Sequence, residues 1–292
     1  MFLLGGCTSL DAEHQGDEYE YLIGVSVPDV MESWLNNMLE EMKVEVSKQA
    51  NVNLLFRDAA QDSETQKQDI EQLLNYGIDL LVVIPTQEAE LRTAIAEAYE
   101  KIPVIIVGEE PKMDAYTTYI HLDNYWIGEA AAKYIVAQEG SENKNIVVFE
   151  GAPGSTISDE RKRGFESVMK EHIPAEQLYY YDGEWIRDKA EDRMKDFVVL
   201  HKEVDVVFAF NDQMAYGAYI ACEKLRVDNV NFIGVDGFSG EGEGLEMIER
   251  GILEATIKCP QIGHQSFQVA MSILDGEEVE KDIMIPAELV TK

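Results

Sequence analysis

The run Ile78-Asp79-Leu80-Leu81-Val82-Val83-Ile84, which leads into Pro85-Thr86-Gln87, decides the fold of this chain. The same pattern returns as Val204-Asp205-Val206-Val207-Phe208-Ala209-Phe210, which leads into Asn211-Asp212-Gln213. Each run places one Asp before unbroken apolar residues, as in a parallel strand that is buried on both faces. Each then reaches residues that can begin a helix. Two such units predict two similar open α/β sheets in one chain.

The rest of the chain alternates strand-like and helix-like runs around these two units. Strands are expected at residues 21–27, 52–56, 78–84, 104–107, 146–149, 178–181, 204–210, 232–235 and 253–257. Helices are expected at 33–49, 63–76, 88–100, 125–139, 158–171, 188–201, 213–225 and 261–275, the second opened by a Ser63/Gln66 capping box. This alternation predicts two Rossmann-like lobes with parallel sheets. Because open sheets bind ligands at the carboxyl ends of their strands, we expect a ligand cleft between the lobes.

The composition argues against nucleic acid as a partner. The chain has 292 residues, enough for about two domains. It carries 24 Lys and Arg against 56 Asp and Glu, a formal net charge of −32. Binding to a phosphate backbone needs a basic patch, and Arg161-Lys162-Arg163 is too short to supply one. The excess of acid is expected to form a solvated surface.

The N-terminus resembles the end of a bacterial lipoprotein signal. Met1-Phe2-Leu3-Leu4-Gly5-Gly6-Cys7 is apolar, then small, then cysteine, although it lacks a basic start and is too short to span a membrane. Residues 8–20 are polar and acidic, as a tether would be. We therefore expect lipid on Cys7 and an extracytoplasmic protein that is anchored to the cell membrane, or else a periplasmic one. A chance apolar N-terminus is the alternative.

Two other cysteines, Cys222 and Cys259, remain if Cys7 carries lipid. Cys222 falls in a helical run, where a small buried thiol is the common state. Cys259 follows a strand and precedes Pro260. Whether the two form a disulfide cannot be judged from their spacing.

Signatures of catalysis are absent from the sequence. It has no Gly-x-Ser-x-Gly elbow, no His-Glu-x-x-His and no phosphate loop, and its five histidines lack metal-ligand spacing. The Gly-rich loop at residues 236–244 reads Asp-Gly-Phe-Ser-Gly-Glu-Gly-Glu-Gly, in which two glutamates would repel a pyrophosphate. We therefore expect no enzyme, no cofactor and no bound metal.

Two tryptophans are candidates for binding a flat, partly apolar ligand. Trp185 lies in a polar stretch after a strand, where its ring could stack on the apolar face of a sugar. Trp34 lies just beyond the first strand. The alternative for Trp185 is a ring folded back on its own helix. For Trp34 it is the buried face of the first helix.

Polar side chains at strand ends are candidates for hydrogen bonds to hydroxyl groups. Asn211 ends the repeated strand and can both donate and accept, whereas Asp212 beside it is expected to be the helix N-cap. Asp236 ends the next strand and can accept two hydroxyl protons, unless it is only a turn residue before Gly237. The rigid fork of Arg161 could bridge adjacent oxygens, unless it is solvated.

From about Tyr21 to Lys292 the chain resembles the type I periplasmic-binding-protein superfamily, specifically the ribose- and galactose-binding proteins of sugar ABC importers. The resemblance is carried by short motifs that are weak singly and specific together: Asp58…Gln61-Asp62, Leu122-Asp123-Asn124, Arg161-x-x-Gly164-Phe165, Phe208-x-x-Asn211-Asp212-x-Met214-Ala215-x-Gly217, Gly234-x-Asp236-Gly237 and Ala255-Thr256-Ile257 before Gln261-Ile262-Gly263. It implies two lobes joined by three strands that close over a sugar. By position, Trp34 and Trp185 match the two aromatic residues that sandwich the sugar ring in this family. The residues that match its polar ligands are Arg161, Asn211 and Asp236. Glu32 falls where the family often has a polar contact, unless it is an exposed acid at the helix start.

This chain departs from that pattern at several positions, which makes ribose itself doubtful. Gly108-Glu109 stands where ribose binders have an Asp-Arg pair. Ile84, Leu122 and Cys259 replace polar or hydroxyl residues. Glu32 and Glu109 could favour a ligand with many hydroxyl groups or a positive charge, such as an amino sugar.

The sequence therefore predicts a binding protein that captures a small sugar or polyol by hinge closure and delivers it to an ABC permease. We expect a monomer with a tether at residues 1–18, an N-terminal lobe at 19–122 plus 259–283, and a C-terminal lobe at 123–258 plus 284–292. The alternative on the same fold is a receptor subunit for a sensory kinase, a chemoreceptor or a quorum signal. A repressor domain would need a basic helix-turn-helix, which residues 1–20 do not provide.

Overall fold

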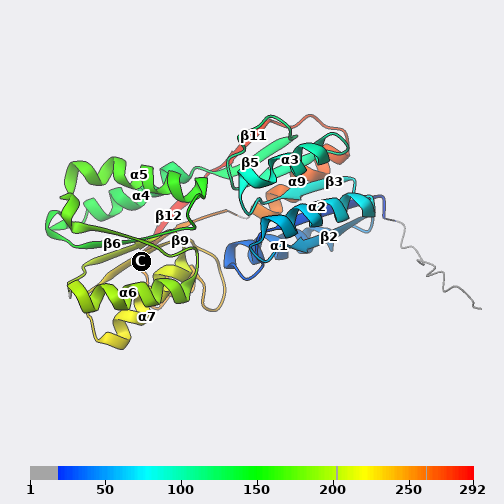
Figure 1. The fold of residues 1–292 in the computed structure, drawn as a ribbon. Coiled ribbons are helices and arrows are strands. Elements are labelled where there is room, and N and C mark those ends of the chain that lie inside the picture. The colour runs from blue at the N-terminus through cyan, green and yellow to red at the C-terminus, as the bar shows by residue number, and fades with distance from the viewer. Residues whose placement is uncertain (1–18, 202, 261) are drawn as a thin grey trace, which may run out of the picture.

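Two α/β lobes lie side by side in the computed structural model, each built on a six-stranded sheet (Figure 1). The structure describes residues 19–201, 203–260 and 262–292. The strand order is β11-β5-β4-β3-β1-β2 in the N-terminal lobe and β12-β10-β9-β8-β6-β7 in the C-terminal lobe. The fold class predicted from the repeated strand is confirmed.

The sheet of the N-terminal lobe is parallel throughout. Its strands are β1 (Tyr21–Val27), β2 (Val52–Asp58), β3 (Leu80–Val83), β4 (Val104–Val107), β5 (Thr118–Leu122) and β11 (Asp282–Ile285). Its helices are α1 (Ser33–Val46), α2 (Ser63–Tyr76), α3 (Glu88–Tyr99) and α9 (Ile262–Leu274). All four residues of β3 are buried, as expected of a strand covered on both faces.

The C-terminal lobe repeats this topology. Its strands are β6 (Ile146–Glu150), β7 (Leu178–Asp182), β8 (Val206–Ala209), β9 (Asn231–Asp236), β10 (Ala255–Lys258) and β12 (Glu288–Thr291). Its helices are α4 (Asn124–Val136), α5 (Thr156–His172), α6 (Arg187–His201), α7 (Asp212–Leu225) and the short α8 (Gly244–Glu249). The purely parallel sheet expected from the sequence is wrong at one edge, because β12 runs antiparallel to β10.

The chain passes between the sheets three times, from β5 to α4, from β10 to α9 and from β11 to β12. These crossings join the lobes at one side (Figure 1). The predicted three-strand hinge is confirmed. Three connections allow the lobes to rotate toward each other while each core stays intact.

Two predicted helix starts are wrong in detail. Asp62, not Ser63, caps α2 by accepting from the backbone N–H of Thr65 at 2.7 Å. Gln66 is buried instead of capping, and its amide donates to the carbonyl oxygen of Ile84 at 2.8 Å. At α7 the cap is Asn211, which accepts from the backbone N–H of Met214 at 2.8 Å. Asp212 is thereby free for a different role.

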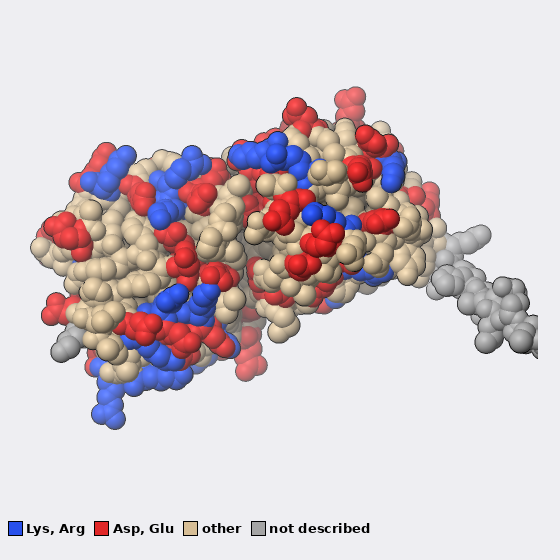
Figure 2. All heavy atoms as spheres, viewed as in Figure 1, with Lys and Arg blue, Asp and Glu red and all other residues tan. Residues whose placement is uncertain are grey.

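Side chains of Asp and Glu are spread over both lobes, with Lys and Arg interspersed on the face that Figure 2 shows. None of the helices in the described ranges is long and apolar enough to cross a membrane. Cys222 and Cys259 are both buried free thiols, so they do not form the disulfide that the sequence left open. The tether and Cys7 lie outside the described residues.

Candidate functional site: the cavity between the lobes

A cavity of about 180 Å³ lies between the two lobes. Its wall is formed by strand ends and the loops that follow them, including the ends of β1 and β3 in one lobe and of β6, β8 and β9 in the other. In each sheet the winding direction reverses next to β1 or β6, which is where open α/β sheets bind ligands. All seven residues proposed for binding line this cavity: Glu32, Trp34, Glu109, Arg161, Trp185, Asn211 and Asp236.

The volume suits a small ring. An apolar cavity of about 150 Å³ accommodates benzene, so the space here can hold a five- or six-membered ring with substituents. Much of the remaining wall is apolar, with Ile84, Leu122, Ile157 and Ile262 among its members. The cavity therefore combines an apolar lining with a few convergent polar groups, as small-molecule sites do.

Asp236 lines the cavity and is only 4% solvent-exposed. Among the described residues, no donor makes a hydrogen bond to its carboxylate. Its φ angle of 116° is unusual for a residue with a side chain and holds the carboxylate at the end of β9. Burial and the neighbouring Asp212 raise the pKa of Asp236, against the pull of Arg161. A buried carboxylate in this state needs donors from a ligand.

Asp212 is a second buried carboxylate close to Asp236. It is 1% exposed and accepts from the backbone N–H of Gly237 at 2.7 Å and from the hydroxyl of Thr256 at 2.7 Å. A Cβ atom at Gly234 or Gly244 would come within 2.0 Å or 1.9 Å of this carboxylate, so both glycines make room for it. Asp212 thus joins the end of β8 to the loop after β9 and to β10.

Arg161 is the cation of the cavity and is 4% exposed. Its Nε donates to Asn124 at 3.0 Å and its Nη1 donates to the carbonyl oxygen of Phe210. Its guanidinium carbon lies 5.6 Å from the centre of the Trp185 ring. Burial lowers the pKa of Arg161, and nearby Asp236 opposes that shift. A fixed guanidinium beside a carboxylate can bridge adjacent oxygens of a ligand.

Trp185 is placed by the backbone around it. Both Trp185 and the residue before it have positive φ angles, 66° and 51°. Asn211 holds this turn by donating from its side-chain amide to the Trp185 carbonyl oxygen at 3.1 Å. A Cβ atom at Gly151 would lie 1.9 Å from the indole ring, so the ring packs over a glycine. Asn211 therefore acts first as a helix cap and a support for Trp185.

The N-terminal lobe contributes Glu32, the residue before α1, and Trp34 in the first turn of α1. Trp34 is partly buried against the core of its own lobe and also lines the cavity. Gln61 donates to Oε1 of Glu32 at 3.0 Å. Burial raises the pKa of Glu32 to about 7, and Asp29 and Glu109 add to the rise. This lobe therefore offers the cavity an aromatic ring and an acid.

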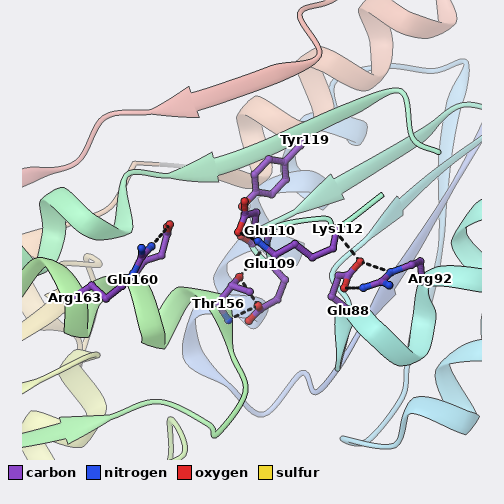
Figure 3. Close-up of polar contacts among 10 residues, drawn as sticks. Glu88, Arg92, Glu109, Glu110, Lys112, Tyr119, Thr156, Glu160 and Arg163 are labelled. Carbon is purple, nitrogen blue, oxygen red and sulfur yellow. Dashed lines mark hydrogen bonds and ion pairs between the residues drawn. The ribbon is translucent and has the colours of Figure 1, made fainter. Parts of the chain in front are cut away.

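Glu109 has a different position from the one expected of a ligand contact. It follows β4 in the N-terminal lobe, and its carboxylate accepts from the start of α5 in the other lobe (Figure 3). The donors are the Ser155 hydroxyl at 2.6 Å, the Thr156 backbone N–H at 2.8 Å and the Thr156 hydroxyl at 2.7 Å. The next residue, Glu110, donates its backbone N–H to the Thr156 hydroxyl at 2.9 Å. Glu109 lines the cavity, but its oxygens are used to hold the lobes together.

Three residues have supporting roles around the cavity that the sequence did not predict. Asn124 orients Arg161, Gln66 fixes the chain after β3, and Gly151 makes room for Trp185. The motif Leu122-Asp123-Asn124 contained a signal for the first of these, although it gave no role. Nothing in the sequence pattern distinguished Gly151 from other glycines, because the contact is with a residue of a distant loop.

A wider crevice of about 610 Å³ lies between α1 and the loops after β9 and β10. It is lined by charged side chains that already have partners, such as Glu45 with Lys48 and His264. Neither Trp34 nor Trp185 lines this crevice. Within residues 19–201, 203–260 and 262–292, no cluster of His, Cys, Asp or Glu could hold a metal ion. The smaller cavity is the better candidate for binding.

The chain belongs to the periplasmic binding proteins, since the periplasmic binding protein domain family matches residues 23–278. This confirms the type I periplasmic-binding-protein resemblance inferred from the motifs. The family binds solutes outside the cytoplasm and is not catalytic.

The relatives include sugar and polyol binders. The ribose import binding protein of Bacillus subtilis is 30% identical, and the match covers 100% of this chain and 96% of the relative. The fructose-binding periplasmic domain of a hybrid two-component system has a TM-score of 0.86 and 32% identity, covering 93% of this chain and 91% of that one. A Bacillus halodurans ABC transporter solute-binding protein with bound myo-inositol has a TM-score of 0.81 and 28% identity, covering 94% and 96%.

Proposed function

We propose that this protein captures a small carbohydrate or polyol in the cavity between its lobes and delivers it to an ABC importer. The observation that carries the proposal is Asp236, a buried carboxylate without a hydrogen-bond donor among the described residues, on the wall of a ring-sized cavity. Hydroxyl groups of a sugar supply such donors, and the rings of Trp34 and Trp185 supply surfaces for its apolar faces.

The mechanism is hinge closure without a chemical reaction. A ligand that contacts both lobes binds the closed arrangement more tightly than the open one. It stabilises the closed arrangement by the difference between these two binding free energies. The bonds from Glu109 to the start of α5 exist only when the lobes are close together, so they add to the same equilibrium. Charge-assisted hydrogen bonds contribute about 1.5–3 kcal/mol each, so a few of them with stacking offset the costs of association.

Several further features belong to the same proposal. Residues 1–18 form a tether with lipid on Cys7, and the protein acts as a membrane-anchored monomer. The lobes divide the chain near the boundaries expected from the sequence, 19–122 plus 259–283 and 123–258 plus 284–292, except that β11 extends the N-terminal lobe to Ile285. Metabolic labelling with a fatty acid analogue, with Cys7→Ser as control, tests the anchor.

A thermal-shift screen of the purified chain against monosaccharides, polyols, amino sugars and nucleosides tests the function. A ligand at about 1,000 times its dissociation constant adds about 4 kcal/mol to the stability of the folded state, which raises the melting temperature by several degrees. We expect a strong response to a sugar or polyol. A response to nucleosides alone, or to none of these compounds, would contradict the proposal.

The second candidate is a sensory receptor subunit on the same fold. It is favoured by one observation, the similarity to a fructose-binding domain of a hybrid two-component system. Both candidates bind a sugar and differ in the membrane partner. Neighbouring genes that encode a permease and an ATPase support import, whereas a sensor kinase gene in their place supports sensing.

A further inference from the structure

The polar groups of the cavity differ in whether their hydrogen bonds are already satisfied. Asn211 is engaged with Met214 and Trp185, and Arg161 with Asn124 and Phe210. The cavity wall also carries four acids, Glu32, Glu88, Glu109 and Asp236. The donors and positive charges that each acid already has determine which groups a ligand must supply.

Three of the four acids have a source of positive charge or several donors. Glu88 makes a two-pronged pair with Arg92, at 3.0 and 2.6 Å, and also accepts the Lys112 backbone N–H (Figure 3). Glu109 is held by the N-terminus of α5, where the helix dipole favours an anion. Asp236 lies in the field of Arg161.

Glu32 is the exception. Its hydrogen-bond partner is the neutral amide of Gln61, and its charged neighbours Asp29 and Glu109 are both acidic. In the described part of the chain, Arg161 is the one Lys or Arg on the cavity wall, and it is paired in the other lobe. Burying a carboxylate without a counter-charge is unfavourable, which is also why the pKa of Glu32 rises to about 7.

A ligand can supply the missing charge. An ammonium group carries a positive charge and three donors, and charge-assisted hydrogen bonds to a carboxylate are stronger than neutral ones. A neutral hydroxyl offers one donor and no charge. An anionic sugar, such as a sugar acid or a sugar phosphate, would add negative charge beside Glu32.

We infer that the cavity takes a sugar or polyol bearing an amino group, which lies against Glu32 while the hydroxyl groups reach Asp236 and Arg161. The inference rests on the proposed function and names the ligand class of the same site. It also separates Glu32 from Glu109, which the sequence had grouped together: Glu32 selects the ligand, and Glu109 holds the closed lobes.

The test compares matched ligands by isothermal titration calorimetry on the purified chain in 150 mM salt. D-glucosamine is measured against D-glucose and against N-acetyl-D-glucosamine, in which the nitrogen is neutral, and D-galactosamine against D-galactose. We expect at least one amino sugar to bind at least tenfold more tightly than its neutral counterparts. Neutral sugars that bind as tightly as the amines, or more tightly, overturn the inference and leave the proposed function in place.

Two matched variants locate the effect. Glu32→Gln should bring the ratio of amine to neutral affinity close to one, because the amide carries no charge. Glu109→Gln makes the same chemical change elsewhere on the wall, and it should weaken both ligands while preserving their ratio. If both variants reduce the ratio equally, the preference arises from the overall negative charge and the role of Glu32 is wrong. If no sugar, polyol or amino sugar binds, the proposed function fails as well.

Discussion

The two lobes share one strand order, yet they bring different chemistry to the cavity between them. The C-terminal lobe supplies Arg161, which bonds to Asn124 and Phe210, and Trp185, which bonds to Asn211. It also supplies Asp236 at the end of β9, whose carboxylate has no hydrogen-bond donor among the described residues. The N-terminal lobe supplies Trp34 and an acid whose partner is a neutral amide. The common topology thus determines where the strand ends meet, and the local sequence decides what they bind. We expect the C-terminal lobe to dominate affinity and the N-terminal lobe to control selectivity and closure.

The largest effect is expected at Asp236 in the C-terminal lobe. Asp236→Ala removes a carboxylate that would accept about two hydroxyl protons, so affinity for the bound sugar should fall about 100-fold. The folded protein should be no less stable at neutral pH, because a buried carboxylate without a hydrogen-bond donor among the described residues is removed. Calorimetric titration and thermal melting measure the two quantities. Unchanged affinity would remove Asp236 from the site.

The next effect concerns the placement of the Trp185 ring. Trp185→Ala should weaken binding at least tenfold through lost stacking. Gly151→Ala should weaken binding as well, since its new methyl group overlaps the indole. The change in near-ultraviolet circular dichroism on adding ligand checks whether the ring has moved. Wild-type affinity in Gly151→Ala would show that the ring position does not matter.

A smaller effect is expected at the contact between the lobes. Glu109→Gln should lower affinity for every ligand about three- to tenfold, because its three hydrogen bonds form only in the closed arrangement. Glu110→Gln is the control: its exposed side chain pairs with Lys112, and the backbone N–H that donates to Thr156 is kept. Titrations of both variants are compared. Equal effects would contradict a specific role for Glu109.

The smallest effect is a change in how stability depends on pH. Burial raises the folded-state pKa of Glu32 from 4.5 to about 7. Ionised Glu32 therefore lowers the free energy of unfolding, and this loss is absent below about pH 4.5 and complete above about pH 7. Glu32→Gln should therefore stabilise the ligand-free protein at pH 8 but not at pH 4. We expect about 1 kcal/mol, or about 2–4 °C in Tm. A stability gain from Glu32→Gln that is larger at pH 4 than at pH 8 would contradict this prediction.

Much of the fold followed from the sequence because buried parallel strands are continuous apolar runs. The fully buried strands β3 and β8 were predicted within two residues at each end. Three strands were not predicted. The inner strand β5 (Thr118–Leu122) is mostly buried, but polar residues interrupt its apolar ones. The edge strands β11 and β12 are short, partly exposed and carry mixed residues. Their pairing depends on chain segments far away in the sequence.

The sequence predicted which residues line the cavity but not the contacts that each of them makes. Polar and aromatic residues at strand ends predicted the lining of the cavity, because parallel strands end at the same edge of each sheet. The roles depend on contacts between distant segments. Asp212 bonds to Thr256 and Glu109 bonds to Thr156, and neither pairing leaves a local pattern in the sequence.

The most direct test is the crystal structure of the chain with the sugar that gives the largest thermal shift. The account predicts one ring in the cavity between Trp34 and Trp185, with its hydroxyl groups bonded to Asp236 and Arg161 and the lobes closed. A sugar in the crevice beside α1, or on the outer surface with the cavity empty, would contradict it.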